Sequence, residues 1–227
     1  MRTLILQHFE RVPEYYDETP ELVLRSRANI AEYAGQIGAE YRFLGGEPFR
    51  PGLRAQCQKV CIINEEYDEY DSVAILDTDK FVTTTCVENV FEAPGVAFFS
   101  DIHRYRLLPA FCREFPQWAD PATPIWSGAI YVMDRELRQT LRAQIDAEME
   151  RMFAAVSPRP YVDEGIIHCL CAKAGVKPLS LDLKWDYSSY LPNPERANMI
   201  HMRHRPKSRI ENYQALVARG IINGEVF

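Results

Sequence analysis

The first 80 residues alternate strand and helix, and no other feature of the sequence restricts the fold as strongly. Strands are expected at 3–6, 39–46 and 70–79, and helices between them at 19–34, with Thr19 as its cap, and 53–63. The third strand, YDSVAILDTD, contains a continuous apolar run of the kind found inside parallel sheets. This β-α-β-α-β order predicts an open α/β sheet, whose ligands bind at the carboxyl ends of the strands.

The second half of the chain is less regular but contains further strand and helix patterns. Strands are expected at 96–101 and 127–134. Asp134 is expected to cap one amphipathic helix that extends to Phe153, and another helix is expected at 164–174. Because no repeat or linker interrupts the sequence, we expect a single domain with two lobes.

Composition excludes several classes of function. The formal charge of −6 over 227 residues argues against a duplex nucleic-acid binder, which would need a basic face. No run of roughly 18 apolar residues is present, so we expect no membrane span. The six cysteines lack paired CxxC spacing, which favours reduced, mostly buried thiols in a cytoplasmic protein. One segment, 201–209, is strongly basic and suggests an anionic ligand, with a solvated basic surface as the alternative.

Two aspartates, Asp77 and Asp79, follow the apolar run of the third strand. Their carboxylates can converge if the chain turns at Thr78 as the strand ends. Such a pair is suited to hold a hard divalent cation, Mg²⁺ or Mn²⁺, which takes oxygen ligands and often shares its shell with substrate phosphates. The alternative is structural, with one acid satisfied by backbone N–H groups and the other in solvent.

The stretch EEYDEYDSVAILDTDKFV, at 65–82, resembles the core of GT-A fold glycosyltransferases, in which a strand of the pattern YD.V..LD.D ends the nucleotide-binding half. The resemblance implies an α/β fold with a Rossmann-like, mostly parallel open sheet, helices on both faces and an acceptor-binding lobe. It further implies that 1–227 is one domain, with 1–100 as the nucleotide-binding half. The acceptor half would be 101–227, including the C-terminal basic segment.

The same resemblance implies a metal site. Asp77 and Asp79 would hold Mn²⁺ or Mg²⁺ against the diphosphate of a sugar nucleotide. A third ligand would come from His201, which follows a short apolar strand, with His204 as the competing histidine. Family members usually have a glycine after this histidine, and this chain has none. Lys80 is given no role in this interpretation.

Further residues are implied to contact the nucleotide. Gln7, His8 and Phe9 follow the first strand, where a base and ribose would bind, although ordinary strand-end residues are the alternative. Lys59, rather than Arg54, is the expected basic residue near the phosphates.

The C-terminal basic segment would add positive charge around the departing diphosphate. Arg203 and Lys207 are the expected contacts, with Arg205 and Arg209 as alternatives, and Thr78 would lie in the same site.

The acceptor half has its own candidates by resemblance. Trp126, Ser127 and Gly128 match a segment in which a small SG motif lets the backbone approach the donor sugar, and the tryptophan offers an apolar face. Trp185 and Asp186 are assigned to the acceptor side.

An acidic motif at the start of the 164–174 helix supplies the candidate catalytic residues, Asp163 and Glu164. Either would point at the donor sugar or serve as base for the acceptor hydroxyl. The alternative for Asp163 is a helix N-cap.

The predicted activity is therefore transfer of a hexosyl group from a nucleoside-diphosphate sugar, with UDP favoured, to a hydroxyl of a glycan or glycolipid. Retention of configuration is preferred to inversion, and contact with a membrane surface would suit a lipid-linked acceptor. One alternative is a haloacid-dehalogenase-like phosphatase that uses Asp77 and Asp79 as nucleophile and acid. Another is a non-catalytic module that binds sugar nucleotides.

Overall fold

A computed structural model describes residues 1–10, 20–159, 162–203 and 208–224. Its central sheet has the strand order β2-β1-β3-β5, built from β1 (Thr3–His8), β2 (Glu40–Leu44), β3 (Ser72–Leu76) and β5 (Ile130–Asp134). β1 is parallel to both β2 and β3, and β5 runs antiparallel to β3. The sheet is therefore mostly parallel, as predicted.

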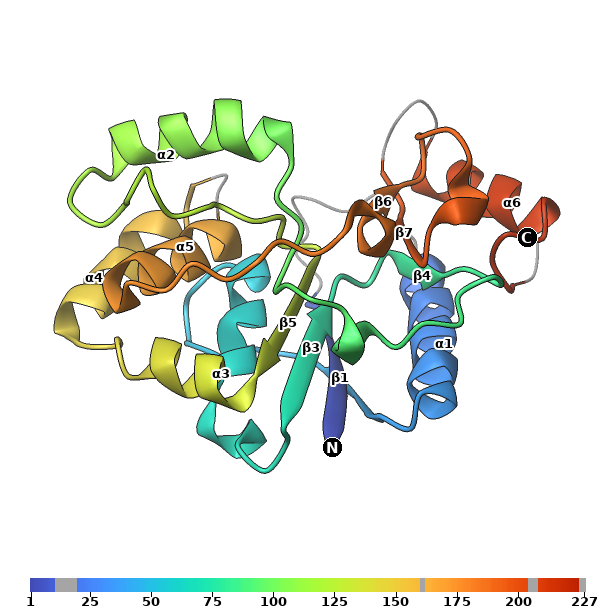
Figure 1. Cartoon of the computed structure of the whole chain (residues 1–227), viewed down its shortest axis with the longest axis horizontal. Coiled ribbons are helices and arrows are strands. Elements are labelled where there is room, and N and C mark those ends of the chain that lie inside the picture. The colour runs from blue at the N-terminus through green and yellow to red at the C-terminus, as the bar shows by residue number, and fades with distance from the viewer. Residues whose placement is uncertain (11–19, 160–161, 204–207, 225–227) are drawn as a thin grey trace.

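Helices cover both faces of this sheet (Figure 1). The α-helices are α1 (Pro20–Gln36), α2 (Leu108–Glu114), α3 (Arg135–Arg142), α4 (Ala147–Val156), α5 (Val162–Ala174) and α6 (Arg209–Ala218). A π-helix, His103–Leu107, leads into α2, and the 3₁₀ helices are η1 (Ala55–Ile63), η2 (Glu65–Tyr67), η3 (Val90–Glu92), η5 (Leu183–Trp185) and η6 (Pro194–Arg196).

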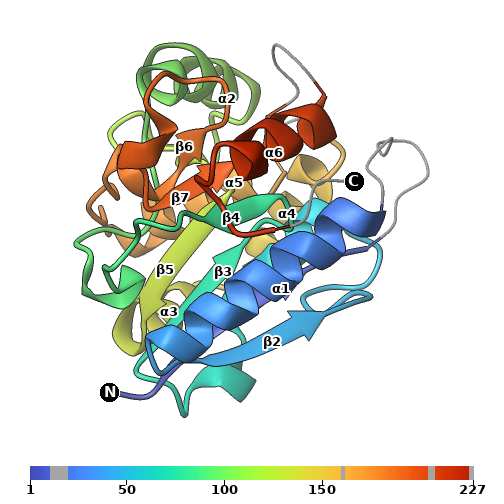
Figure 2. The ribbon, with the colours of Figure 1, turned by 90° about the vertical axis from the view of Figure 1, so that its right-hand side faces the viewer.

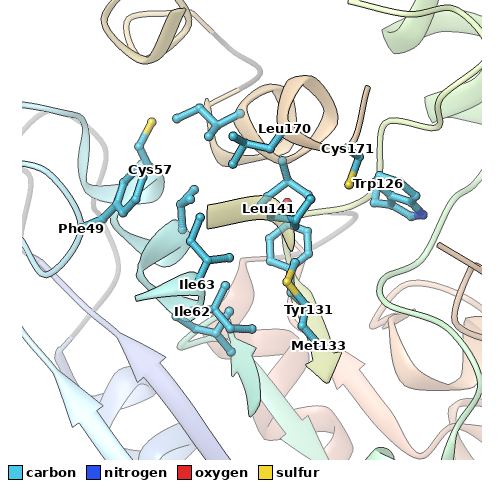
Figure 3. Packing of buried hydrophobic residues seen from close by; sticks show 14 of the residues in the cluster. Phe49, Cys57, Ile62, Ile63, Trp126, Tyr131, Met133, Leu141, Leu170 and Cys171 are labelled. Carbon is cyan, nitrogen blue, oxygen red and sulfur yellow. The ribbon is translucent and has the colours of Figure 1, made fainter. Parts of the chain in front are cut away.

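Alternation along the strands divides the core into two layers. In β1, Leu4 and Leu6 face the layer under η1 and α3 to α5, whereas Ile5 faces α1. Figure 2 shows α1 crossing its own face of the sheet. Figure 3 shows the other layer, where Tyr131 of β5 and Leu170 of α5 meet in one cluster. These layers hold the carboxyl ends of β1 and β3 side by side.

A second, smaller sheet lies beyond the end of β3 (Figure 1). Its order is β4-β7-β6, from β4 (Lys80–Val82), β7 (Met199–His201) and β6 (Tyr187–Ser188). β4 pairs antiparallel with β7, and β6 pairs parallel with β7. The C-terminal part of the chain is thereby returned to the strand that follows the acidic pair.

Three sequence predictions about secondary structure are wrong or incomplete. Residues 96–101 form no strand: the backbone of Val96 and Phe98 bonds to three separate segments, and Ala97 makes only an isolated bridge with Ser180. The single helix predicted after Asp134 is two helices, because Asp146 caps the start of α4. The helix at 53–63 is a 3₁₀ helix that begins at Ala55.

Two other local predictions are confirmed, the cap at Asp134 and the free, mostly buried cysteines. The Asp134 side chain accepts a hydrogen bond from Leu137 N at the start of α3. All six cysteines are free, and four of them are buried. The predicted cap Thr19 lies outside the described residues. None of the helices in the described part of the chain combines the length and apolar character that a membrane span requires.

Gly165 tests the packing of α5. A methyl group at this position would lie 2.8 Å from Phe111 Cε2 and 2.9 Å from Val156 Cγ1. Gly165→Ala should lower the free energy of unfolding by about 1–3 kcal/mol, because overpacking outweighs the better helix propensity of alanine. The matched control is Gly35→Ala in α1, where no atom lies within 4 Å of the added methyl. It should be neutral or slightly stabilising in urea unfolding, and equal effects of the two substitutions would contradict the packing described.

Candidate active site

The acidic pair occupies a tight turn between the two sheets. β3 ends at Leu76, and Lys80 N donates to Asp77 O (3.3 Å), which closes a turn over Thr78 and Asp79. Asp77 N donates to Ala129 O at 3.0 Å, so the turn stays attached to the edge of β5. The turn at Thr78 brings both carboxylates to the same side, and Asp79 is almost completely buried.

His201 joins the two aspartates through the β4–β7 pairing. Lys80 pairs with His201 in register, and Met202 N donates to Asp79 O at 2.9 Å. His201 Nε2 then lies 3.2 Å from Asp79 Oδ1 and 3.8 Å from Asp77 Oδ2. One ligand atom from each of the three residues lies within 4.8 Å of the others.

These three residues fit a divalent cation. Asp79 Oδ1 is buried and makes no hydrogen bond, although an unbonded buried carboxylate oxygen is costly. Two carboxylates and one imidazole form an O, O, N donor set that suits Mn²⁺ or Mg²⁺ better than a soft metal. Burial by itself lowers the pKa of His201, but Asp79 and Asp186 outweigh it and the pKa is raised. A cation would replace the positive charge that this proton supplies.

A pocket of about 200 Å³ opens over the three residues. It lies at the carboxyl ends of β1 and β3, the edge that the sequence predicts. Its lining is His8, Phe9, Glu10, Ala55, Gln56, Lys59, Asp77, Thr78, Asp79, His201, Arg203 and Arg209. Three of these side chains are cationic, and Arg209, at the start of α6, places Nε 3.4 Å from Asp79 Oδ2. Three others, Glu10, Asp77 and Asp79, are acidic, so the pocket would suit an anionic ligand once a cation occupies the two aspartates.

Lys59 forms the floor of the site. Its buried ammonium donates to Asp77 Oδ1 (2.7 Å) and Gly128 O (2.7 Å), and lies 3.2 Å from Asp163 Oδ2. Burial opposes the charge of Asp77, but Lys59 and His201 lower its pKa below the usual value. Of the two basic residues considered for the phosphates, Lys59 lines the pocket and Arg54 does not, and its contact to a phosphate stays a prediction.

Asp163 and Glu164 lie beneath the pocket, in the first turn of α5, and neither is among its lining residues in the described chain. Asp163 is a helical residue here, so the N-cap alternative does not hold. Glu164 Oε1 accepts a hydrogen bond from Gly128 N at 3.0 Å, and a methyl at Gly128 would overlap the Asp163 carboxylate. Burial is the main reason why the pKa values rise to about 6 for Asp163 and about 8 for Glu164.

Asp186, which the sequence assigned to the acceptor side, lies behind His201 instead. Its Oδ1 accepts from Lys80 Nζ at 2.8 Å and lies 3.3 Å from His201 Nδ1. Burial raises the pKa of Asp186, but Lys80 and His201 dominate and lower it well below the usual range. Lys80, which the sequence interpretation left without a role, is fully buried beside it. The signal available was the position of a lysine directly after the acidic pair.

Four predicted contacts have different surroundings. Gln7 is buried, and its amide donates to Ser26 Oγ and Asp77 O, so it supports the turn and does not face the pocket. Trp126 and Trp185 belong to the core and are at most 1% exposed, so neither presents its ring to a sugar in this arrangement. Ser127 is buried, with its N–H bonded to Phe98 O.

Part of the C-terminal basic segment, 204–207, lies outside the described residues, and the predicted contacts Lys207, Arg205 and the rival His204 lie within it. Arg203 lines the pocket, as does Arg209.

Solved structures of the same fold match nearly the whole chain. One is a glycosyltransferase involved in the glycosylation of the major capsid of PBCV-1, with a TM-score of 0.57 and 14% identity, covering 96% of this chain and 100% of that one. Another is the galactosyltransferase LgtC in complex with donor and acceptor sugar analogs, with a TM-score of 0.55 and 10% identity over 99% and 98% of the two chains.

The bifunctional glycosyltransferase WbbM, in its apo form, is similar at a TM-score of 0.59 and 11% identity, over 96% of this chain and 50% of WbbM. No protein-family model and no curated protein sequence matches. The chain therefore has the fold of GT-A glycosyltransferases, which confirms the predicted fold class, with a buried Asp-x-Asp and histidine cluster that fits a metal site.

The raised pKa of Glu164 has a measurable consequence. Because the folded state holds this proton up to about pH 8 and the unfolded chain releases it near pH 4.5, Glu164 reduces stability progressively as the pH rises across that window. Glu164→Gln keeps an acceptor for Gly128 N but cannot titrate. The stability of wild type relative to Glu164→Gln should therefore fall from pH 5 to pH 8, with a slope of at most about 1.4 kcal/mol per pH unit.

Urea unfolding at several pH values measures this difference. Glu136→Gln is the matched control, since Glu136 also occupies the first turn of a helix, α3, but is exposed. A pH-independent difference between wild type and Glu164→Gln would show that Glu164 is ionised in the folded protein at pH 5.

Proposed function

We propose that this protein transfers a hexosyl group from a nucleoside-diphosphate sugar to a hydroxyl of a glycan or glycolipid acceptor, with a Mn²⁺ or Mg²⁺ ion as cofactor. The observation that carries the proposal is the convergence of Asp77, Asp79 and His201 under a pocket with cationic walls. The glycosyltransferases of the same fold support the class of reaction. UDP is the favoured nucleotide, as expected from the sequence resemblance.

Different residues of the pocket would stabilise the leaving diphosphate in different ways. A cation held by Asp77, Asp79 and His201 would act as a Lewis acid for that group. Arg203 and Arg209 supply guanidinium groups that can form charge-assisted hydrogen bonds to phosphate oxygens. Lys59 keeps Asp77 ionised at the floor, so that the aspartate remains a ligand. His8 and Phe9 are left to contact the base or ribose at the end of β1.

We infer that 1–100 serves mainly the nucleotide and that 101–227 serves the acceptor while returning His201, Arg203 and Arg209 to the donor site. The contact of Asp163 to the transferred sugar stays a prediction from the resemblance, since in this arrangement Asp163 pairs with Lys59 beneath Gly128, and Glu164 supports that loop. Retention of configuration is favoured over inversion, because both carboxylates are engaged by Lys59 or by the backbone and neither lines the pocket as a free base would.

Asp79→Asn tests the metal and the nucleotide together. In wild type, UDP with Mn²⁺ at about 100 times Kd should raise Tm by about 5–10 °C, since such ligation stabilises the folded state by about 2.7 kcal/mol. Asp79→Asn should abolish the shift caused by the pair, because the amide lacks the charge of the ligand oxygen.

The control for this experiment is Asp68→Asn, which removes a carboxylate from an ion pair with Arg142 away from the pocket and should preserve the shift. The same comparison with GDP, CMP and dTDP identifies the nucleotide. Absence of stabilisation by every nucleotide with Mn²⁺ would contradict the proposal, and Asp77-dependent hydrolysis of p-nitrophenyl phosphate would favour a phosphatase.

Arg203→Gln separates contacts to phosphate from contacts to the base. It should weaken UDP binding by about tenfold or more, since a hydrogen bond to a charged group contributes about 1.5–3 kcal/mol, and should leave uridine binding unchanged. Isothermal titration with both ligands measures the two affinities. Arg151→Gln, at an exposed position on α4, is the control. Equal losses for UDP and uridine would exclude Arg203 from the phosphate site.

A further inference from the structure

A buried chain of three charged or polar side chains lies behind the candidate metal ligands. Lys80 Nζ donates to Asp186 Oδ1 at 2.8 Å, and the same oxygen lies 3.3 Å from His201 Nδ1. The exposed fractions are 0% for Lys80, 2% for Asp186 and 3% for His201. Burying a lysine and an aspartate together is expensive unless their geometry is good, so this pair calls for an explanation beyond general stability.

The register of the small sheet places these residues together. Lys80 and His201 are directly opposite in the β4–β7 pair, so their side chains leave the same face. β6 pairs with β7 so that Tyr187 lies opposite Ile200. Asp186, the residue immediately before β6, is thereby placed beside Lys80 and His201. Lys80 Nζ also donates to Trp185 O at 2.9 Å, which fixes the backbone that carries Asp186. The arrangement thus depends on backbone pairing from three separate parts of the chain.

We propose that Asp186 is a positioning residue, which accepts the Nδ1 proton of His201 and so directs the Nε2 lone pair to the cation, while Lys80 is the buried counter-charge that holds Asp186 in place. This inference rests on the metal site of the proposed function.

The chemistry of imidazole supports this assignment. A neutral ring has one N–H, and a carboxylate faces each nitrogen, Asp79 at Nε2 and Asp186 at Nδ1. With a cation at Asp77 and Asp79, Nε2 would be a ligand, so the proton would lie on Nδ1, where the ionised Asp186 can only accept it. Nε2, on the side of Asp77 and Asp79, then has the lone pair that can bind the cation. A carboxylate on the far nitrogen of a metal-bound histidine fixes the tautomer and the orientation of the ring.

Lys80 accounts for why this carboxylate is directed to the histidine and not to the cation itself. Its ammonium occupies the same Oδ1 that faces His201. The other oxygen, Oδ2, lies 4.0 Å from an Arg203 guanidinium nitrogen. Asp186 therefore has a cationic group near each oxygen, and among the described residues the carboxylates grouped with His201 for a metal are those of Asp77 and Asp79.

Two double variants isolate the hydrogen bond to His201. Lys80→Met with Asp186→Asn removes both charges but keeps an oxygen acceptor, whereas Lys80→Met with Asp186→Leu removes the acceptor as well. Both should fold, because replacing a buried ion pair by neutral groups of similar volume is often harmless. The leucine variant should bind Mn²⁺ about 10- to 100-fold more weakly than the asparagine variant, the usual effect of losing such a partner. Electron paramagnetic resonance of free Mn²⁺ measures both affinities.

The matched control replaces the remote ion pair, with Arg142→Met and Asp68→Leu, and should leave Mn²⁺ affinity unchanged. Equal Mn²⁺ affinity of the two Lys80→Met variants would overturn the positioning role while leaving the proposed function intact. Wild type that binds no Mn²⁺, with or without UDP, would instead overturn the proposed function.

Nitrogen-15 NMR of histidine in wild type loaded with ¹¹³Cd²⁺ provides a test that needs no variant. The His201 ring should carry its proton on Nδ1 and show cadmium coupling at Nε2. A proton on Nε2, or coupling at Nδ1, would overturn the inference even if the leucine variant does not fold.

Discussion

The burial of several carboxylates around one turn is the constraint on which the site depends. Asp79, Asp163 and Asp186 are buried and Asp77 is partly buried, and a buried anion is stable only with a close positive partner. Lys59 and Lys80 meet this requirement from opposite sides. Lys59 forms ion pairs with Asp77 and Asp163 at the floor of the site, and Lys80 forms one with Asp186 behind the histidine.

Two carboxylate oxygens of this group are buried without a hydrogen bond, and one of them, Asp163 Oδ2, still lies 3.2 Å from the Lys59 ammonium. Asp79 Oδ1 has no hydrogen bond, and both lysines are engaged elsewhere. Among the described residues, the ion pairs of Asp79 are with Arg209, which approaches the other oxygen, and with His201, which is positively charged only when protonated. A divalent cation between Asp77, Asp79 and His201 would satisfy the remaining oxygen and replace the histidine proton. The ion pairs thus leave Asp79 Oδ1 as the oxygen that a bound cation would satisfy.

The strand β3 and the turn that follows it could be predicted from the sequence. The continuous apolar run before Asp77 and Asp79 predicted that β3 is a buried strand and that the chain turns at Thr78, because both depend on residues close in the chain. Its parallel pairing was predicted for only one of its two neighbours correctly, since β1 is parallel to β3 and β5 is antiparallel. The short strands β6 and β7 have two and three residues, too few for a periodic pattern to reveal their pairing. Only that pairing shows that Lys80 belongs with Asp186.

The two tryptophans did not indicate the ligand site, since a tryptophan ring is as common in cores as at ligand sites. Trp126 and Trp185 pack in the two layers of the core, so neither ring is exposed to contact a sugar.

The two buried ion-pair systems also belong to different sheets. Lys59, Asp77 and Asp163 join η1, the end of β3 and α5, whereas Lys80, Asp186 and His201 join the three strands of the small sheet. They meet at the turn that contains Asp77 and Asp79. A cation bound there would take ligands from both systems, so its binding would strengthen the attachment of the small sheet to the central one. Ligation would then stabilise Arg203 and Arg209, the two arginines that line the pocket after β7.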